Sequence, residues 1–330
     1  MKLIINSPGI YLAKRGECFL VKNGDDKQEF SCRKVQQILI TTAAAISTDA
    51  IELAVENNID IVFLKFNGQP LGRIWHSRLG SITTIRRKQL VLQNHPFGLK
   101  LVKEWILSKM EKQIVFLNKL AMNRRDERRQ LIKDTITIIG TQADNIKRIP
   151  TGNCVEEVRY SLLGYEGTAG RAYFSTLGKI IPQAYAFESR SRNPALDPFN
   201  CMLNYSYGIL YSSVEKSCIL AGLDPYIGIM HTDNYNKVAL VYDLIEMYRV
   251  YMDELVFKLF TTKKIRDEYF DKIQNGYYLN QDGKKLLVGE YNKFLEKRIR
   301  HKGRNIQMQN IIQFDCHELA NRLLKEPLPC

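Results

Sequence analysis

A small set of side chains in this sequence could hold a divalent metal ion. Glu166 stands in the segment YEG, His231 lies in the loop sequence GIMHTDN, and Asp243 and Glu246 follow in a segment of helical character. Because Asp243 and Glu246 are three residues apart, a helix would place both carboxylates on one face. Carboxylate oxygens combined with one imidazole suit Mg²⁺ or Mn²⁺, and the imidazole favours Mn²⁺. The sequence therefore offers Glu166, His231, Asp243 and Glu246 as candidate site residues.

Ordinary structural roles explain each of these residues, taken alone, better than metal binding does. A loop histidine such as His231 is more often solvated or packed than bound to a metal. Glu166 would also suit the first turn of a helix, where the helix dipole favours an acidic residue. Arg249, three residues after Glu246, is in position to form an ion pair with it. Spacing and composition alone leave both interpretations open.

Several other enzyme classes lack their characteristic motifs here. The sequence has no HExxH segment, no P-loop and no nucleophile elbow. Without a loop that binds nucleotide phosphates, any joining of DNA strands would have to exchange one phosphodiester for another. The seven cysteines are scattered and never spaced as C-x-x-C, so we expect reduced, structural thiols.

The charge balance favours a polyanionic partner. Lysine and arginine number 48 against 35 aspartate and glutamate residues, a formal net charge of +13, and such an excess promotes binding to nucleic acid through counterion release. Two basic runs stand out, at 124–129 and at 297–302. The first contains its own acidic residues, so the second, at the end of an expected helix, is the better candidate for phosphate contacts.

Length and hydropathy predict a protein of two domains that does not cross a membrane. The 330 residues exceed the length of about 250 to 300 residues at which one hydrophobic core usually divides. No segment approaches the roughly 20 apolar residues of a membrane span, and the first residues lack the features of a secretory signal. We expect a cytoplasmic location.

Hydrophobic periodicity changes along the chain from that of strands to that of helices. Short β segments precede residue 75, with one helix over 46–58 and a tight hairpin at Asn67-Gly68. After Arg86, apolar residues recur every three or four positions. The sequence predicts an α+β fold as two separate domains, an N-terminal β-rich domain over 1–80 with one short helix and a C-terminal all-α domain over 81–330, with a hinge at 75–84. The expected strands are Leu3–Ile5, Tyr11–Leu12, Cys18–Val21, Val35–Ile40 and Ile61–Leu64, and the expected later helices are Leu99–Leu117, Arg128–Ile139, Arg171–Ile181, Asn200–Leu220, Val238–Phe260 and Lys284–Arg300.

Several short segments of the sequence resemble motifs of a known protein family and occur in the same order as in that family. The residues EGTAGRAYF from Glu166 resemble an E-G-x-A-x-R-x-Y-F segment of the CRISPR-associated endonucleases and spacer integrases. The later segments RSRNP from Arg190, DPFN from Asp197, GIMH ending at His231 and YDLIE ending at Glu246 follow in the family's order. The N-terminal segment ISTDAIELAVENNIDIVFLKFNGQPLGR also resembles the family. The resemblance therefore covers most of the chain.

The resemblance implies a site, an activity and partners. Glu166, His231 and Glu246 would be the ligands of one Mg²⁺ or Mn²⁺ ion, and Asp243 a supporting residue. Many family members place aspartate at the position of Glu246. The ion would act as a Lewis acid while a 3′-hydroxyl of a short DNA duplex attacks a phosphodiester at the edge of a CRISPR repeat, and Arg171 and Arg190 would hold DNA phosphates.

The partners implied are double-stranded DNA as prespacer and repeat, a second copy of the chain bound through the N-terminal domain, and the small second CRISPR-associated protein. Two other functions remain open from the sequence. One is a structure-selective repair nuclease that cuts branched DNA with the same metal site. The other is a non-catalytic DNA-binding scaffold, which would have no need of Glu166, His231 and Glu246 together.

Overall fold

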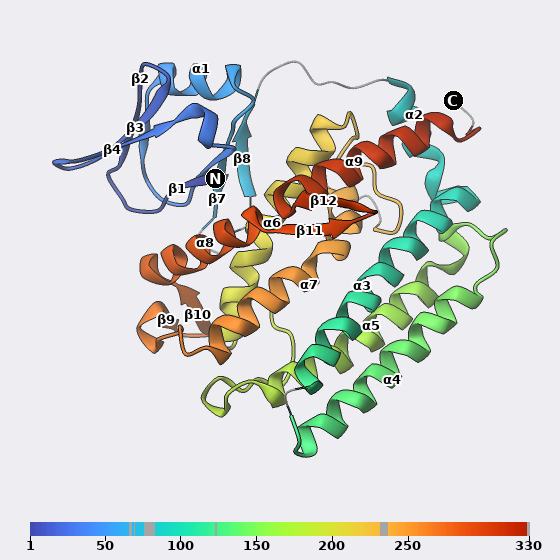
Figure 1. Ribbon diagram of the computed structural model, residues 1–330. Helices are drawn as coiled ribbons and strands as arrows, with labels where there is room; N and C mark the ends of the chain where they lie inside the picture. Colours follow the sequence, from blue (N-terminus) through green and yellow to red (C-terminus); the bar gives the residue numbers. More distant parts are fainter. Residues whose placement is uncertain (66–67, 69, 76–82, 123, 232–236, 329–330) are drawn as a thin grey trace.

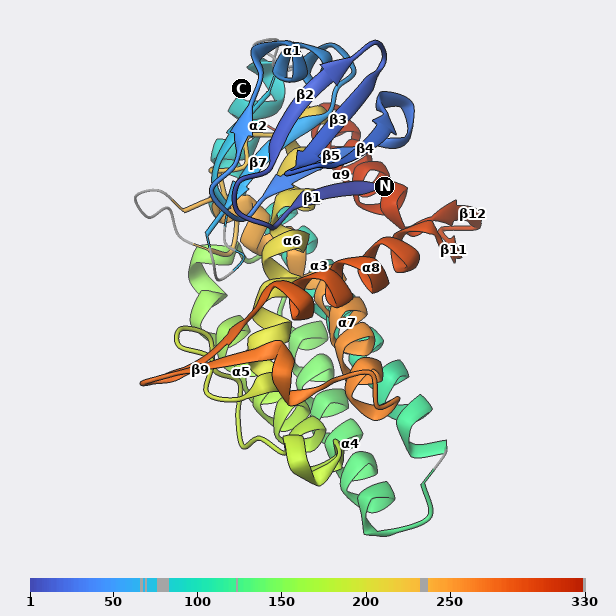
Figure 2. The same ribbon diagram turned by 90° about the vertical axis from the view of Figure 1, so that its left-hand side faces the viewer.

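Strands come first along the chain and helices afterwards, as the sequence predicts (Figure 1). The computed structural model describes residues 1–330 apart from 66–67, 69, 76–82, 123, 232–236 and 329–330. Seven of the ten residues of the hinge expected at 75–84 therefore lie outside the described residues. In Figure 2 the strand-rich part lies at one end of the molecule and the long helices extend away from it.

Two four-stranded sheets form the N-terminal part. One has the order β1-β5-β7-β8, in which the first three strands are parallel and β8 is antiparallel. The other has the order β4-β3-β2-β6. All five expected strands are present, and β4 and β6, whose segments are short or polar, are additional. The strands are β1 Lys2–Ile5, β2 Tyr11–Arg15, β3 Cys18–Asn23, β4 Asp26–Ser31, β5 Gln37–Ile40, β6 Ala45–Ile46, β7 Asp60–Leu64 and β8 Pro70–Ile74.

One helix and one hairpin in this part follow directly from local sequence signals. Helix α1, Thr48–Glu56, begins after Ser47, whose side chain accepts a hydrogen bond from the backbone N–H of Ala50, as an N-cap residue should. The hairpin of β7 and β8 is confirmed by the antiparallel pairing of Ile61 with Ile74. Its residue Gly68 has a φ of 84°, a conformation that glycine adopts without a steric penalty.

Eight helices after residue 82 form most of the remainder of the described chain. Contacts between α3, α4, α5, α6 and α7 build the main body, and α9 packs against α2, α6 and α8. The helices are α2 Thr83–Val91, α3 Pro96–Met122, α4 Glu127–Arg148, α5 Val155–Ile180, α6 Pro198–Leu220, α7 Ala239–Thr261, α8 Gln281–Glu296 and α9 Met308–Lys325. The short 3-10 helices are η1 Cys32–Lys34, η2 Leu92–Asn94, η3 Gln183–Tyr185 and η4 Asp267–Tyr269.

The expected start of the helix at Arg171 is wrong. Helix α5 begins at Val155, so Glu166 lies in its middle and not in a first turn. Glycines within α5 lower the helical propensity of this segment, but Leu162, Ala169 and Tyr173 are buried on one face. Tertiary packing of that face therefore stabilises a helix that propensity alone would interrupt.

The expected helix over Lys284–Arg300 is correct only as far as Glu296. Residues Arg298–His301 form strand β11, which pairs with β12, Arg304–Gln307. A second hairpin joins β9, Phe270–Ile273, to β10, Gly276–Leu279. The C-terminal part is thus helical with two short hairpins added, and the all-α description holds for its body only.

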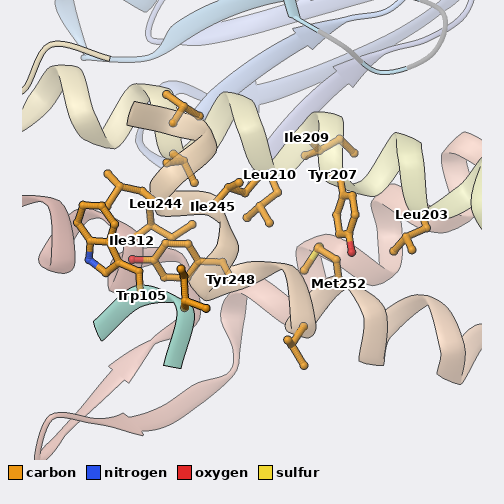
Figure 3. Packing of buried hydrophobic residues seen from close by; sticks show 14 of the residues in the cluster. Trp105, Leu203, Tyr207, Ile209, Leu210, Leu244, Ile245, Tyr248, Met252 and Ile312 are labelled. Carbon is orange, nitrogen blue, oxygen red and sulfur yellow. The ribbon is translucent and has the colours of Figure 1, made fainter. Parts of the chain in front are cut away.

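Two hydrophobic clusters accompany this division. The smaller one contains residues of the N-terminal strands and of α1, including Leu12, Phe19 and Leu53. The larger one lies mainly among the helices and also includes buried residues of β5 and β7. Figure 3 shows part of it, where Leu244, Ile245 and Tyr248 of α7 pack among side chains of α3, α6 and α9. Helix α7 is buried on several sides, and this fixes its orientation.

Polar and backbone contacts join the sheet to α6. Buried Asp60 of β7 lies 3.2 Å from the ammonium of Lys216 and 3.6 Å from the guanidinium of Arg73. The ammonium of Lys2 donates to the Ser213 hydroxyl over 2.5 Å, and burial lowers the pKa of Lys2 to about 7, although Asp60 opposes this shift. A Cβ added to Gly208 would lie 2.0 Å from the Gly68 carbonyl oxygen. The hairpin and α6 therefore contact each other directly through the backbone atoms of Gly68 and Gly208.

None of the helices in the described ranges combines the length and apolar character that a membrane span requires. The six cysteines that the structure describes are free thiols, as expected.

Candidate active site

The four candidate site residues come from three places in the chain and line one small cavity. Glu166 projects from the middle of α5, Asp243 and Glu246 from the first turns of α7, and His231 from the segment before α7. The cavity is closed on its other sides by Val102, Trp105 and Ile106 of α3 and by Met230. Packing of the apolar faces of these helices thus brings together residues that are up to 80 positions apart in the sequence.

Asp243 organises the backbone that carries His231. Its Oδ2 accepts hydrogen bonds from the backbone N–H groups of Ile229 and Met230 at 2.6 and 3.1 Å. Its Oδ1 lies 3.0 Å from the His231 backbone nitrogen and 2.6 Å from Nδ1 of the same residue. A buried carboxylate with four hydrogen bonds cannot turn toward another ligand without losing several of them. Asp243 therefore fixes the loop and the imidazole, and only Nε2 of His231 remains available.

A lysine joins the two glutamates. The ammonium of Lys109, on α3, lies 2.6 Å from Oε1 of Glu166 and 2.6 Å from Oε2 of Glu246. Burial opposes the charged form of Lys109, but the charges of Glu246 and Glu166 outweigh it and raise the pKa of this lysine. Lys109 carries no distinguishing signal in the sequence, because it lies in a long amphipathic helix, where a lysine resembles an ordinary surface residue.

A second cation pairs with Glu246. A guanidinium nitrogen of Arg249 lies 3.1 Å from Oε1 of Glu246, so the ion pair expected from the sequence is present, although both side chains are largely buried. Burial would raise the pKa of the Glu246 carboxyl, but Arg249 and Lys109 together lower it to about 2. Burial likewise works against protonation of His231, yet its hydrogen bond with Asp243 raises the pKa of the imidazole. Glu246 is therefore an ionised carboxylate compensated by two close cations, Lys109 and Arg249.

The donor set fits a divalent cation even though the described residues do not form a finished metal shell. Within the described ranges, no three His, Cys, Asp or Glu side chains are arranged as a ready metal site. Glu166 and Glu246 nevertheless converge on a single positive charge at Lys109. Carboxylate oxygens and one imidazole nitrogen are ligands for Mn²⁺ or Mg²⁺. A change in the position of the Lys109 side chain would leave the two carboxylates at the cavity that His231 also lines.

The two arginines predicted to contact DNA differ in their surroundings. Arg171 is exposed on α5 and donates to the Thr168 hydroxyl at 3.2 Å. Arg190 is held by the side chains of Asn200 and Asn204 at 2.7 and 2.5 Å. Its guanidinium carbon lies 5.3 Å from the ring centre of Tyr207. Arg190 is therefore a firmly positioned group, whereas Arg171 can reach outward.

A larger cleft leads to the site. Its volume is about 880 Å³, and it extends from the β7–β8 hairpin across α6 to His231 and Glu246. Basic side chains outnumber acidic ones along it, and several tyrosines are interspersed. The charged and tyrosine residues of the lining are Lys65, Arg73, Arg190, Arg192, Lys237, Arg249, Glu215, Glu246, Tyr207, Tyr211, Tyr226 and Tyr242. Such a lining suits a polyanion with flat bases.

The fold and the site together define a protein with a strand-rich N-terminal part and a carboxylate–histidine site at a basic cleft between that part and the helices. A family model described as CRISPR associated protein Cas1 matches residues 3–293. The chain belongs to the Cas1 family.

Curated relatives match nearly the whole chain. CRISPR-associated endonuclease Cas1 1 of Archaeoglobus fulgidus is 33% identical over 334 residues, covering 97% of this chain and 95% of the relative. CRISPR-associated endonuclease Cas1 1 of Francisella tularensis subsp. novicida is 29% identical, covering 98% of this chain and 96% of the relative.

Solved structures share the fold. A Cas1 protein from Thermotoga maritima has a TM-score of 0.81 at 20% identity, with 99% of this chain and 98% of that chain covered. A casposase bound to an integration product has a TM-score of 0.82 at 23% identity, with 99% of this chain and 92% of that chain covered.

Proposed function

We propose that this protein is a divalent-metal-dependent DNA integrase and endonuclease that inserts new spacers into a CRISPR array. The observation that carries the proposal is the meeting of Glu166, His231, Asp243 and Glu246 at one cavity beside a basic cleft. A scaffold that only bound DNA would have no use for a buried Glu246 carboxylate held ionised by Lys109 and Arg249. The endonuclease names of the curated relatives and the integration product in the casposase structure support the same activity.

Each site residue has a distinct part in this proposal. Glu166, Glu246 and Nε2 of His231 would hold one Mg²⁺ or Mn²⁺ ion, which when bound supplies Lewis acidity to a phosphodiester. Asp243 keeps the proton on Nδ1 of His231, so that the lone pair of Nε2 points away from the loop. Arg249 keeps Glu246 ionised through its contact at 3.1 Å.

The proposed reaction exchanges one phosphodiester for another. The 3′-oxygen of a short DNA duplex forms a bond to a phosphorus atom at the edge of a CRISPR repeat. The bond from that phosphorus to the repeat strand's own 3′-oxygen breaks, and this oxygen takes up a proton while the attacking hydroxyl loses one. No nucleotide energy source is consumed. With water as the nucleophile the same site cleaves DNA.

The cleft provides a path for the DNA to the site. Arg190 and Arg192 lie along it beside Tyr207, where cationic and aromatic groups can contact phosphates and bases. We also propose Arg171 as a phosphate contact at the exposed side of α5.

The domain organisation and the assembly belong to the same proposal. Residues 1–80 would form the dimerisation domain and 81–330 the catalytic domain of a homodimer. A small Cas2-type protein would bridge two dimers. A Cas6-RT-Cas1–Cas2 complex that contains a chain with this fold supports the last point.

Covalent joining of two DNAs tests the proposal most directly. A labelled duplex with 3′-hydroxyl ends is incubated with repeat DNA and Mn²⁺, and longer joined strands are resolved by electrophoresis. His231→Ala should abolish joining without unfolding the protein, whereas His317→Ala, which changes an exposed histidine of α9, should not. A duplex with blocked 3′ ends is the matched substrate control.

The outcomes separate the candidate functions. Joining that needs the 3′-hydroxyl, Mn²⁺ and His231 supports the integrase. Cleavage of branched DNA without joining would favour a structure-selective repair nuclease. Binding without either reaction would favour a scaffold, and full activity in the His231→Ala protein would show that the site is assigned wrongly.

A further inference from the structure

The hairpin of β11 and β12 is a basic ribbon with two unlike faces. Its strands pair Arg298 with Gln307, Ile299 with Ile306, Arg300 with Asn305 and His301 with Arg304. Residues directly opposite each other point to the same side of a two-stranded sheet, and the side alternates at each step. One face therefore carries Arg298, Arg300, Asn305 and Gln307.

The opposite face anchors the ribbon to the helices. Ile299 and Ile306 pack against the main hydrophobic cluster. Nε2 of His301 lies 2.8 Å from Oδ1 of Asp315 on α9. The other carboxylate oxygen of Asp315 accepts a hydrogen bond from the Tyr248 hydroxyl of α7 at 2.9 Å. A two-stranded hairpin is marginally stable alone, so these contacts hold it in a fixed position.

The turn between β11 and β12 is well defined, and the ribbon extends outward from the helices. Lys302 and Gly303 have φ angles of 47° and 80°, which is the requirement of a two-residue turn. The ammonium of Lys302 is neutralised by Asp315 and Glu318 at 2.9 and 2.5 Å. Figure 2 shows β11 and β12 extending beyond the helices at the margin of the molecule.

The arginines of the outer face are available for a partner. Arg298, Arg300 and Asn305 are exposed, and Gln307 is half-buried and accepts a hydrogen bond from Gln309. None of the carboxylates in the part of the chain that the structure describes pairs with Arg298 or Arg300. Unpaired guanidinium groups beside carboxamides form a surface with many donors and a few acceptors.

We infer that this outer face binds duplex DNA in the major groove and reads base edges there. A groove of about 12 Å admits a two-stranded ribbon, arginine pairs with guanine through two hydrogen bonds, and asparagine or glutamine pairs with adenine in the same way. Residues two apart on a strand are separated by about 6.6 Å, and two base-pair steps of about 3.4 Å each give nearly the same length. An acidic protein surface could bind the arginines, but it would make no use of carboxamides placed beside them at a spacing of about 6.6 Å.

This inference deepens the proposed function, since it assigns to the ribbon part of the recognition of duplex DNA, and it rests on DNA as substrate. Binding is measured in EDTA, where no strand transfer or cleavage takes place. A failure of the joining assay at His231 therefore leaves the ribbon test intact, and a failure of the ribbon test leaves the joining assay intact.

The test compares three variants of the full-length protein. Arg298→Ala with Arg300→Ala removes both outer arginines, and Asn305→Ala with Gln307→Ala removes both carboxamides. Arg129→Ala with Arg148→Ala, on exposed positions of α4, is the control with the same change in charge. Affinity is measured by fluorescence anisotropy on labelled duplexes, and thermal melting checks the fold of each variant.

The expected result has two parts. The ribbon arginine variant should bind duplex DNA at least about ten-fold more weakly than the α4 control, because each lost two-bond contact to a base is a substantial loss. When the parent selects duplexes from a pool of random sequence, it should enrich a short motif that the carboxamide variant no longer enriches. Equal weakening by the ribbon and control variants would overturn the inference, since charge alone would then explain binding. Absence of an enriched motif with the parent would overturn base reading.

Discussion

Replacing Asp243 by asparagine should uncouple the loop that carries His231 from α7. The wild-type carboxylate accepts hydrogen bonds from three backbone N–H groups and approaches Nδ1 of the imidazole at 2.6 Å. An amide nitrogen cannot accept, so Asp243→Asn loses about half of these bonds and places one donor against another. Each hydrogen bond to a charged group contributes roughly 1.5 to 3 kcal/mol, and we expect a loss of about 3 kcal/mol or more in the free energy of unfolding.

Two measurements on two variants make this prediction specific. Asp243→Asn should lower the melting temperature by at least about 5 °C and also impair strand transfer. His231→Ala keeps the three bonds from the backbone to Asp243, so it should abolish strand transfer while the melting temperature stays within about 2 °C. An Asp243→Asn protein that melts like the parent would refute the view that this carboxylate supports the loop. A stable but inactive Asp243→Asn protein would indicate a direct part in the chemistry instead.

Three further perturbations test other parts of the structure. Burial lowers the pKa of Lys2 to about 7 from its ordinary 10.5, so between these two pH values the unfolded chain binds more protons than the folded protein. The free energy of unfolding should therefore rise with pH in this range, by up to about 1.4 kcal/mol per pH unit. Lys2→Met should remove this dependence on pH in melting curves taken from pH 7 to 9. Gly208→Ala should destabilise the protein by about 1 to 3 kcal/mol in urea unfolding, because the added Cβ would lie 2.0 Å from the Gly68 carbonyl oxygen. The control Gly140→Ala has nothing within 4 Å of the added Cβ and should stabilise α4 by up to about 1 kcal/mol. Lys109→Met leaves Glu246 and the partly buried Glu166 without their shared cation, so the melting temperature should fall in EDTA and most of the loss should be regained in Mn²⁺. An unchanged melting temperature in EDTA, or a loss that Mn²⁺ leaves uncorrected, would contradict this.

Strong local signals were sufficient for most of the fold. The period of apolar residues located α3, α6 and α7, and the Asn-Gly dipeptide located the β7–β8 hairpin. The errors arose where packing overrides propensity. Glycines lower the helical propensity of the first four turns of α5, so the predicted helix starts too late, at Arg171. At the other end of the chain, the predicted helix runs through Arg298–Arg300, where Ile299 alternates with arginines in strand β11.

The candidate site shows a similar division. Glu166, His231 and Glu246 were chosen through ordered motifs, and only the packing of α3, α5 and α7 brings them to one cavity. Asp243 could be proposed from its spacing, but its four hydrogen bonds depend on the path of the preceding loop. Lys109 had no signal in the sequence, since nothing local distinguishes it from the other lysines of α3. A partner that lies 57 or more positions away becomes visible only in three dimensions.

The contact between Gly208 and the hairpin turn has a consequence for how this protein can be recombined and evolve. One wall of the cleft is built by β8 and the other by α6, and the turn before β8 approaches the α6 backbone too closely for any side chain at Gly208. Under the proposed function, a DNA strand would enter a channel whose width is set during folding, and little ordering of the walls would remain to oppose binding. Chimaeras made from two related proteins should keep their function only when the hairpin and α6 come from the same parent.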